Sequence, residues 1–223
     1  MRDRRRYDNS SRQAQARQTR ARVVEAARAL FVDNGYAATS LSRVAEAARV
    51  SMPTIQKAFG TKAALVKAVY DVTLAGDDEP IPMASRPEFV RLAAQTDPQE
   101  TLRLYCEIGR ALWSRLGALF PAILAGAMSG EPDLVELRAA IASESRIGAA
   151  DLIGQLDALG GLRNGLDPAE AVETLWWLLQ PEQYVILVHH GGWTLDQYVD
   201  WFHHTASWLL LGRSVVSEPA GPD

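Results

Sequence analysis

The four histidines of the chain form two adjacent pairs, His189-His190 and His203-His204. Imidazole nitrogens bind transition metals, so paired histidines raise the hypothesis of a metal site. Neighbouring residues do not share a helix face, however, and neither a histidine pair four residues apart nor a nearby cysteine cluster supports such a site. The pattern favours solvated or interface histidines, and we expect no bound metal.

Cys106 is the single cysteine, which excludes an intramolecular disulfide and suits a reducing compartment. Beside Tyr105 it could line a pocket or sense oxidation, although a buried and inert cysteine is the more frequent case. The chain lacks the phosphate-loop, nucleophile-elbow and zinc-protease motifs, and carboxylates such as Glu107, Glu136 and Glu144 have ordinary helix-surface spacing. We therefore predict neither an enzyme nor a cofactor.

Polar and basic side chains between residues 39 and 62 suit contacts to DNA, and two short helices are predicted to carry them. The first has apolar residues at helical spacing, and the second is capped by Ser51 and stopped at Gly60. Pro53 is compatible with the second helix because it lies in the first turn. Ile55 would pack back on the first helix and leave the opposite face free. A supporting helix followed by a short helix with one free face is the geometry of a helix-turn-helix.

Two kinds of DNA contact follow from this arrangement. Base edges would be read by the residues that face outward on the second helix, which are Met52, Pro53, Gln56 and Lys57. Phosphates would be contacted by Lys57, Lys62, Arg43 and Thr39, with a weaker contribution from Arg49. The hydroxyls of Ser51 and Thr54 are compatible with either kind of contact.

Over about residues 17–75 the chain resembles the TetR-type family of transcriptional regulators. The resemblance rests on A-R-x-L-F-x-x-x-G-Y-x-x-T-S-L-x-x-V-A, then V-S-x-x-T-I, then F-x-T-K-x-x-L. Two positions depart from the family pattern: Arg49 stands where a glycine usually forms the turn, and Gln56 where a tyrosine often contacts phosphate. Because arginine is a poor left-handed residue, either the turn is shaped differently or Arg49 takes some strain. Gln56 can still hydrogen-bond phosphate or adenine.

The distribution of charge separates the two halves of the chain. Residues 1–67 hold 14 Lys or Arg against 5 Asp or Glu, whereas residues 68–223 hold 9 against 22, for a net charge of −4. A basic tail alone could be a solvated arm, but beside a helix-turn-helix pattern it favours a polyanion-binding end. The acidic remainder would discourage DNA from binding the wrong face.

The pattern predicts an all-α fold, because no run alternates as a strand would. An acidic, proline-containing break over residues 76–82 marks the boundary between modules. The predicted parts are a disordered basic arm (1–16), a helix-turn-helix domain (17–76), an effector-binding and dimerisation domain (77–214) and a flexible tail (215–223). In the DNA-binding part, helices are expected at 17–34 and 62–75 besides the two short ones. Beyond it they are expected at 86–95, 98–116, 118–128, 132–159, 168–190 and 194–212, with Pro181 kinking or breaking the helix at 168–190.

The last two predicted helices are apolar over more than one face, so they would meet a second copy of the chain. The resemblance likewise implies a four-helix dimer bundle. Candidate interface residues are Leu175, Tyr184, Leu187, Tyr198, Trp201, Phe202, Trp208 and Leu209. The alternative is that these faces form the core of a single domain.

A small-molecule effector, largely apolar, is expected between the helices of the second domain. Bulky residues that would enclose it are Tyr105, Trp113, Phe120, Met128, Trp176 and Trp177, although such a stripe is often plain core. We predict a cytoplasmic, homodimeric, ligand-responsive repressor that binds an inverted-repeat operator in double-stranded DNA and does not associate with membranes. The alternatives are an activator, or an all-α small-molecule-binding protein or enzyme whose helix-turn-helix is only a packing element.

Overall fold

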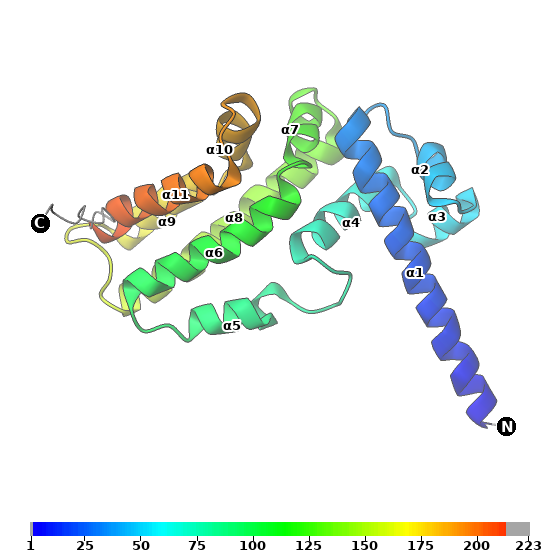
Figure 1. Cartoon of the computed structure of the whole chain (residues 1–223), viewed down its shortest axis with the longest axis horizontal. Coiled ribbons are helices and arrows are strands. Elements are labelled where there is room, and N and C mark those ends of the chain that lie inside the picture. The colour runs from blue at the N-terminus through cyan, green and yellow to red at the C-terminus, as the bar shows by residue number, and fades with distance from the viewer. Residues whose placement is uncertain (1, 213–223) are drawn as a thin grey trace, which may run out of the picture. The chain divides into compact units, whose positions relative to one another are not determined.

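The computed structural model describes residues 2–212 in backbone and residues 14–212 in side chains. Every regular element in this part of the chain is helical, which confirms the predicted all-α fold (Figure 1). The described residues form two compact units. The N-terminal unit comprises the residues up to Glu79 together with Ala118–Arg138, and the C-terminal unit comprises Pro80–Gly117 and the residues from Ala139 onward. The predicted domains were continuous in sequence, so the inclusion of 118–138 in the first unit was not anticipated.

The N-terminal unit is built around one long helix. Its elements are α1 (Arg2–Asn34), α2 (Leu41–Ala48), α3 (Met52–Ala58), α4 (Lys62–Ala75), α7 (Phe120–Met128) and the first turns of α8 (Pro132–Ala158). Helix α1 packs against α2, α4 and α7, and α2 packs against α3. Phe31, Val44, Ile55, Leu65 and Val69 are buried at this core.

Helix α1 begins at Arg2, whereas the sequence predicted a disordered arm over residues 1–16 followed by a helix from residue 17. The run lacks an apolar period, yet it contains neither glycine nor proline and is rich in good helix formers. The predicted C-terminal tail, residues 215–223, lies outside the described residues.

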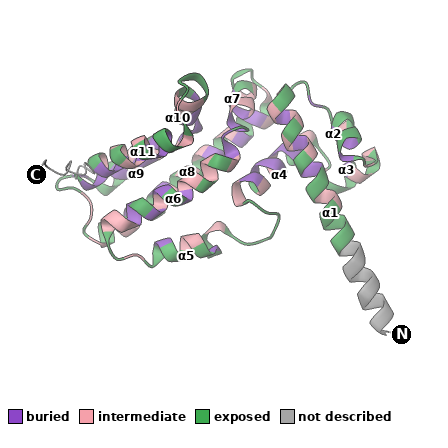
Figure 2. Cartoon of the chain, in the orientation of Figure 1, coloured by how far each residue is buried: buried purple, intermediate pink, exposed green. Residues whose placement is uncertain are grey.

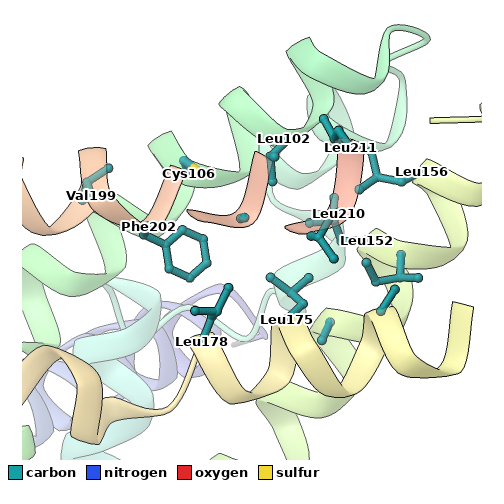
Figure 3. Close-up of a cluster of buried hydrophobic side chains, with 14 of the residues drawn as sticks. Leu102, Cys106, Leu152, Leu156, Leu175, Leu178, Val199, Phe202, Leu210 and Leu211 are labelled. Carbon is teal, nitrogen blue, oxygen red and sulfur yellow. The ribbon is translucent and has the colours of Figure 1, made fainter. Parts of the chain in front are cut away.

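The C-terminal unit packs its helices around a large apolar core (Figure 3). Besides most of α8, its elements are η1 (Met83–Ser85), α5 (Pro87–Ala93), α6 (Pro98–Leu116), α9 (Pro168–Leu178), α10 (Pro181–Tyr184), η2 (Val185–His190), α11 (Leu195–Ala206) and η3 (Ser207–Leu211). Helix α11 packs on both α6 and α9. Leu102, Leu156, Leu175 and Leu210 are completely buried, so four elements share one core.

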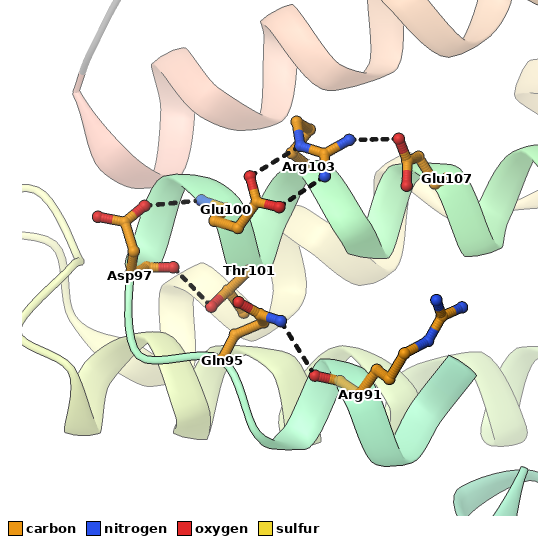
Figure 4. Close-up of polar contacts among 7 residues, drawn as sticks. All are labelled: Arg91, Gln95, Asp97, Glu100, Thr101, Arg103 and Glu107. Atoms are coloured by element: carbon orange, nitrogen blue, oxygen red, sulfur yellow. Dashed lines mark hydrogen bonds and ion pairs between the residues drawn. The ribbon is translucent and has the colours of Figure 1, made fainter. Parts of the chain in front are cut away.

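The predicted helix ends are set by local chemistry. Asp97 caps α6 by accepting a hydrogen bond from the Glu100 backbone N–H at 2.8 Å, and Arg103 pairs with Glu100 one turn on (Figure 4). Thr194 forms the predicted capping box with Gln197 at the start of α11. Caps of this kind supply partners for backbone groups that a helix end leaves unpaired.

Pro181 breaks the long predicted helix, as expected. Helix α9 ends at Leu178, and Pro181 begins α10, because its ring cannot donate the backbone hydrogen bond that a helix interior requires. The segments after α10 and α11 are π-helical, which the sequence pattern did not predict.

In the described part of the chain no helix is long and apolar enough by itself to cross a membrane; α6 and α7 meet the length and composition test only when joined.

Candidate nucleic-acid interface

Helix α3 is anchored by one side chain and capped by another. Ile55 is completely buried against the unit, whereas Pro53, Gln56 and Lys57 are exposed and Met52 is half-buried. Figure 2 colours the residues of α3 by these burial classes. The Ser51 hydroxyl accepts a hydrogen bond from the Thr54 backbone N–H at 3.3 Å. A helix of two turns therefore presents one polar face outward, and the four residues predicted to read bases lie on the same short element.

The turn between α2 and α3 carries backbone strain at Arg49. This residue adopts φ 54° and ψ 48°, and no other described residue except glycine has a positive φ. Its N–H donates to the Glu46 carbonyl at 3.0 Å, and the Val50 N–H donates to the Ala45 carbonyl at 3.0 Å. Of the two alternatives left by the sequence, the left-handed turn is kept and Arg49 takes the strain. Strained residues of this kind are concentrated at functional sites. The Arg49 side chain is exposed, as the predicted contact with phosphate requires.

The two groups predicted to contact phosphate from Arg43 and Thr39 differ in solvent exposure. The exposed Arg43 guanidinium donates to the Ala38 carbonyl at 2.7 Å, which orients it at the base of the helix-turn-helix. Thr39 is only 1% exposed, and its hydroxyl lies 2.9 Å from the Gly35 carbonyl and 3.1 Å from the Leu30 carbonyl. In contrast to the prediction, Thr39 is not placed to contact phosphate, because it ties the α1–α2 connection to the end of α1.

Lys62, the other predicted phosphate contact, is half-buried. Its ammonium lies 3.7 Å from the centroid of the Tyr36 ring, and the Tyr36 hydroxyl donates to the Asp133 carboxylate at the start of α8. Burial lowers the pKa of Lys62, while the charges of Glu131 and Asp133 oppose that shift. Burial and the hydrogen bond to Asp133 raise the pKa of Tyr36, so the phenol stays protonated and acts as the donor. Sequence reasoning missed these two acids because they lie about 70 residues beyond Lys62 in the chain.

The residues predicted to bind an effector are not gathered around one space. Trp113 stacks on Tyr184 with ring centroids 5.0 Å apart, and the Trp176 indole N–H donates to the Ala142 carbonyl at 2.8 Å, both within the C-terminal unit. Tyr105 is half-buried beside the same core. The other three are placed differently: Trp177 is 57% exposed, and Phe120 and Met128 belong to the N-terminal unit, where Met128 is 88% exposed. The spacing of apolar residues marked a buried face on each helix but not which unit that face would join.

The residues predicted for a dimer interface divide into core and surface. Four of them, Leu175, Tyr184, Tyr198 and Phe202, are buried inside their own chain and are not available to a partner. Leu187, Trp201 and Leu209 are half-buried, and Trp208 is 66% exposed. The large exposed apolar side chains on these last elements are Trp177, Ile186 and Trp208. Half of the set therefore belongs to the core of its own chain, and an interface role stays a prediction for the other half.

The structure gives little support to a redox-active cysteine or to a metal site. Burial raises the pKa of the Cys106 thiol to about 12, so the thiolate that oxidation requires is disfavoured. Among the described residues no three His, Cys, Asp or Glu side chains are placed to hold a metal ion.

A cavity of about 430 Å³ lies in the C-terminal unit, and none of the predicted effector residues lines it. Its lining is Asp97, Pro98, Gln99, Gly160, Gly161, Leu162, Arg163, Asn164, Leu211 and Gly212.

Comparison with known proteins bears on the fold and on the N-terminal unit. Residues 23–69 match the family model described as bacterial regulatory proteins, tetR family. The solved SmeT–triclosan complex is similar in structure, with a TM-score of 0.68 and 17% identity over 92% of this chain and 100% of the other. NalD, the secondary repressor of the MexAB-OprM multidrug efflux pump in Pseudomonas aeruginosa, has a TM-score of 0.56 and 19% identity over 87% of this chain and 96% of its own. No curated protein sequence matches the chain.

Proposed function

We propose that this chain is a transcriptional repressor of the tetR type that binds operator DNA through α3; the match of residues 23–69 to the model of that family supports the proposal. The observation that carries the proposal is the anchoring of α3 by Ile55, which leaves Pro53, Gln56 and Lys57 exposed. A short helix held in this way can enter a major groove, where base edges present distinct patterns of donors and acceptors.

The charge of the chain supports the same proposal. The basic residues concentrate in 1–67, so the end of the chain that carries α3 attracts a polyanion, while the acidic remainder repels it. The exposed Arg43 and Arg49 would contact phosphates around the groove. Together with Lys62, they would position the helix without reading sequence.

We further propose that the repressor is a homodimer on an inverted-repeat operator. Exposed Trp177, Ile186 and Trp208 offer apolar surface that a second copy would cover. Two recognition helices related by a two-fold axis would then meet half-sites about one helical turn, or a multiple, apart. This assignment replaces the buried half of the predicted interface set with Trp177 and Ile186.

An effector in the C-terminal unit would release the operator by shifting the population of two dimer arrangements. Support comes from the aromatic side chains around Trp113, Tyr184 and Tyr198. Among structural neighbours, one is a complex with triclosan and another is a repressor of an efflux pump. We therefore propose a small, largely apolar ligand and a role as a repressor.

The test is a fluorescence-anisotropy titration with DNA from upstream of the protein's own gene and with random DNA. Lys57→Ala should cost about 1–3 kcal/mol on the operator and much less on random DNA if Lys57 reads a guanine edge. Arg91→Ala removes an exposed charge from the C-terminal unit and serves as the matched control. Equal loss on both DNAs would make Lys57 a phosphate contact. Failure of the unmodified protein to bind either DNA would favour the alternative, in which the helix-turn-helix is only a packing element of an enzyme or binding protein.

A further inference from the structure

Lys62 is held by partners that lie far from it in sequence but belong to the same compact unit. Its ammonium lies over the Tyr36 ring at 3.7 Å from the centroid. The edge of that ring is fixed by the hydrogen bond from the Tyr36 hydroxyl to Asp133, in the first turn of α8. Asp133 and its neighbour Glu131 both favour the charged form of Lys62. The ring, its hydroxyl and the Asp133 carboxylate therefore form one polar cluster beside a single cation, and the charge of Glu131 acts on the same cation.

This cluster gives Lys62 two possible anionic partners. A phosphate would be attracted to the ammonium at the start of α4, where the helix amides also favour an anion. The carboxylates attract the same ammonium from within the protein, and they repel phosphate. A cation shared in this way binds DNA less tightly than one that is free, since part of its interaction with the acids is lost when phosphate arrives.

We propose that Glu131 and Asp133 compete with DNA phosphate for Lys62 and thereby set the affinity of the N-terminal unit for DNA of any sequence. The proposal rests on the DNA-binding function proposed above. Tyr36 is a positioning residue in this scheme, because its ring face holds the ammonium and its hydroxyl holds Asp133. Since Lys62 contacts phosphate and not bases, the competition lowers affinity for operator and random DNA alike.

The place of the two acids in the chain gives this competition a regulatory use. Helix α8 runs without a break from Pro132 to Ala158, and its residues from Ala139 onward belong to the C-terminal unit. A shift of α8 would move Asp133 in its first turn, and through the hydrogen bond to Tyr36 it would alter the competition for Lys62. By linkage, DNA that captures Lys62 would weaken the hold of the acids by the same factor.

The experiment compares Glu131→Gln with Glu136→Gln, which removes an exposed carboxylate from α8, the helix that Glu131 directly precedes. Binding is measured on operator and on random DNA by fluorescence anisotropy. Glu131→Gln should tighten both by about two- to fivefold, the range expected for a partly screened attraction between charges near the surface, and Glu136→Gln should have a smaller effect. In a Lys62→Gln background the gain from Glu131→Gln should disappear, and the slope of log affinity against log salt should fall by about 0.9.

Asp133→Asn and Tyr36→Phe test the hydrogen bond, with thermal unfolding by circular dichroism to identify a folding defect. Asp133→Asn should also tighten DNA binding if the variant folds; if it does not, the Glu131→Gln comparison decides alone. The proposal is overturned if Glu131→Gln gives no gain beyond Glu136→Gln, or if its gain persists with Lys62→Gln, because the effect would then be general repulsion. In both of these outcomes the unmodified protein would still bind DNA, so the proposed function would stand while this inference failed. Absence of DNA binding by the unmodified protein would instead remove the proposed function and this inference with it.

Discussion

The two units place their candidate functional side chains by different means. In the N-terminal unit, α3 has two turns, one fully buried anchor at Ile55 and a polar face whose exposure follows from the helix itself. In the C-terminal unit, Trp113, Tyr184 and Tyr198 touch one another from three elements, so none of their positions follows from one helix. Local geometry therefore specifies the surface that we propose to read DNA, whereas packing specifies the surroundings of the proposed ligand.

The sharpest test of this difference lies in α11 and η3. Phe202→Ala should destabilise the C-terminal unit by about 3–5 kcal/mol, because it empties a buried site in the shared core (Figure 3). Trp208→Ala, at a side chain 66% exposed, should change stability far less but should weaken self-association. Urea unfolding and light scattering at one fixed protein concentration separate the two effects. A large loss of stability from Trp208→Ala would place that residue in the core after all.

A corresponding test in the N-terminal unit uses Ile55→Ala. Loss of the buried anchor should cost about 2–5 kcal/mol and abolish operator binding, because α3 would no longer be held on α2. Gln56→Ala, at the exposed neighbouring position, should leave stability within about 0.5 kcal/mol. Urea unfolding and anisotropy titrations of both variants give the result. Retained operator binding by a destabilised Ile55→Ala would show that α3 needs no anchor.

Arg49→Gly should stabilise the N-terminal unit by about 0.5–1 kcal/mol. Glycine relieves the left-handed strain of about 1–2 kcal/mol but loses more conformational entropy on folding. If the exposed guanidinium contacts phosphate, DNA affinity should fall while the melting temperature rises. Thermal unfolding and a salt series of DNA titrations report the two properties independently. If the variant is more stable and binds DNA with unchanged affinity, the strained Arg49 makes no contribution to DNA binding.

Tyr198→Phe should have the smallest effect, between no change and a gain of about 1 kcal/mol. The Tyr198 hydroxyl is buried and has no hydrogen-bond partner in the structure, so its removal relieves a desolvated group without emptying the core. Thermal unfolding measures the change. Destabilisation beyond about 1 kcal/mol would indicate that the hydroxyl is satisfied, and a ligand acceptor would then be the first partner to seek.

Much of the fold could be predicted because its determinants are local. The caps at Asp97 and Thr194, the break at Pro181 and the anchor at Ile55 each act within one or two helical turns. The π-helical segments that end α10 and α11 had no such local signal.

The sequence by itself determined the all-α fold, the helix-turn-helix and the outward face of α3, since hydrophobic period, caps and charge are written in neighbouring residues. Only the tertiary structure decided that Thr39 is buried, that Phe202 is core while Trp208 is surface, and that Asp133 binds Tyr36, whose ring carries Lys62. The physical reason is that an apolar helix face shows that it must be covered but not by which helix. A carboxylate likewise shows its charge but not the distant cation that the fold will bring to it.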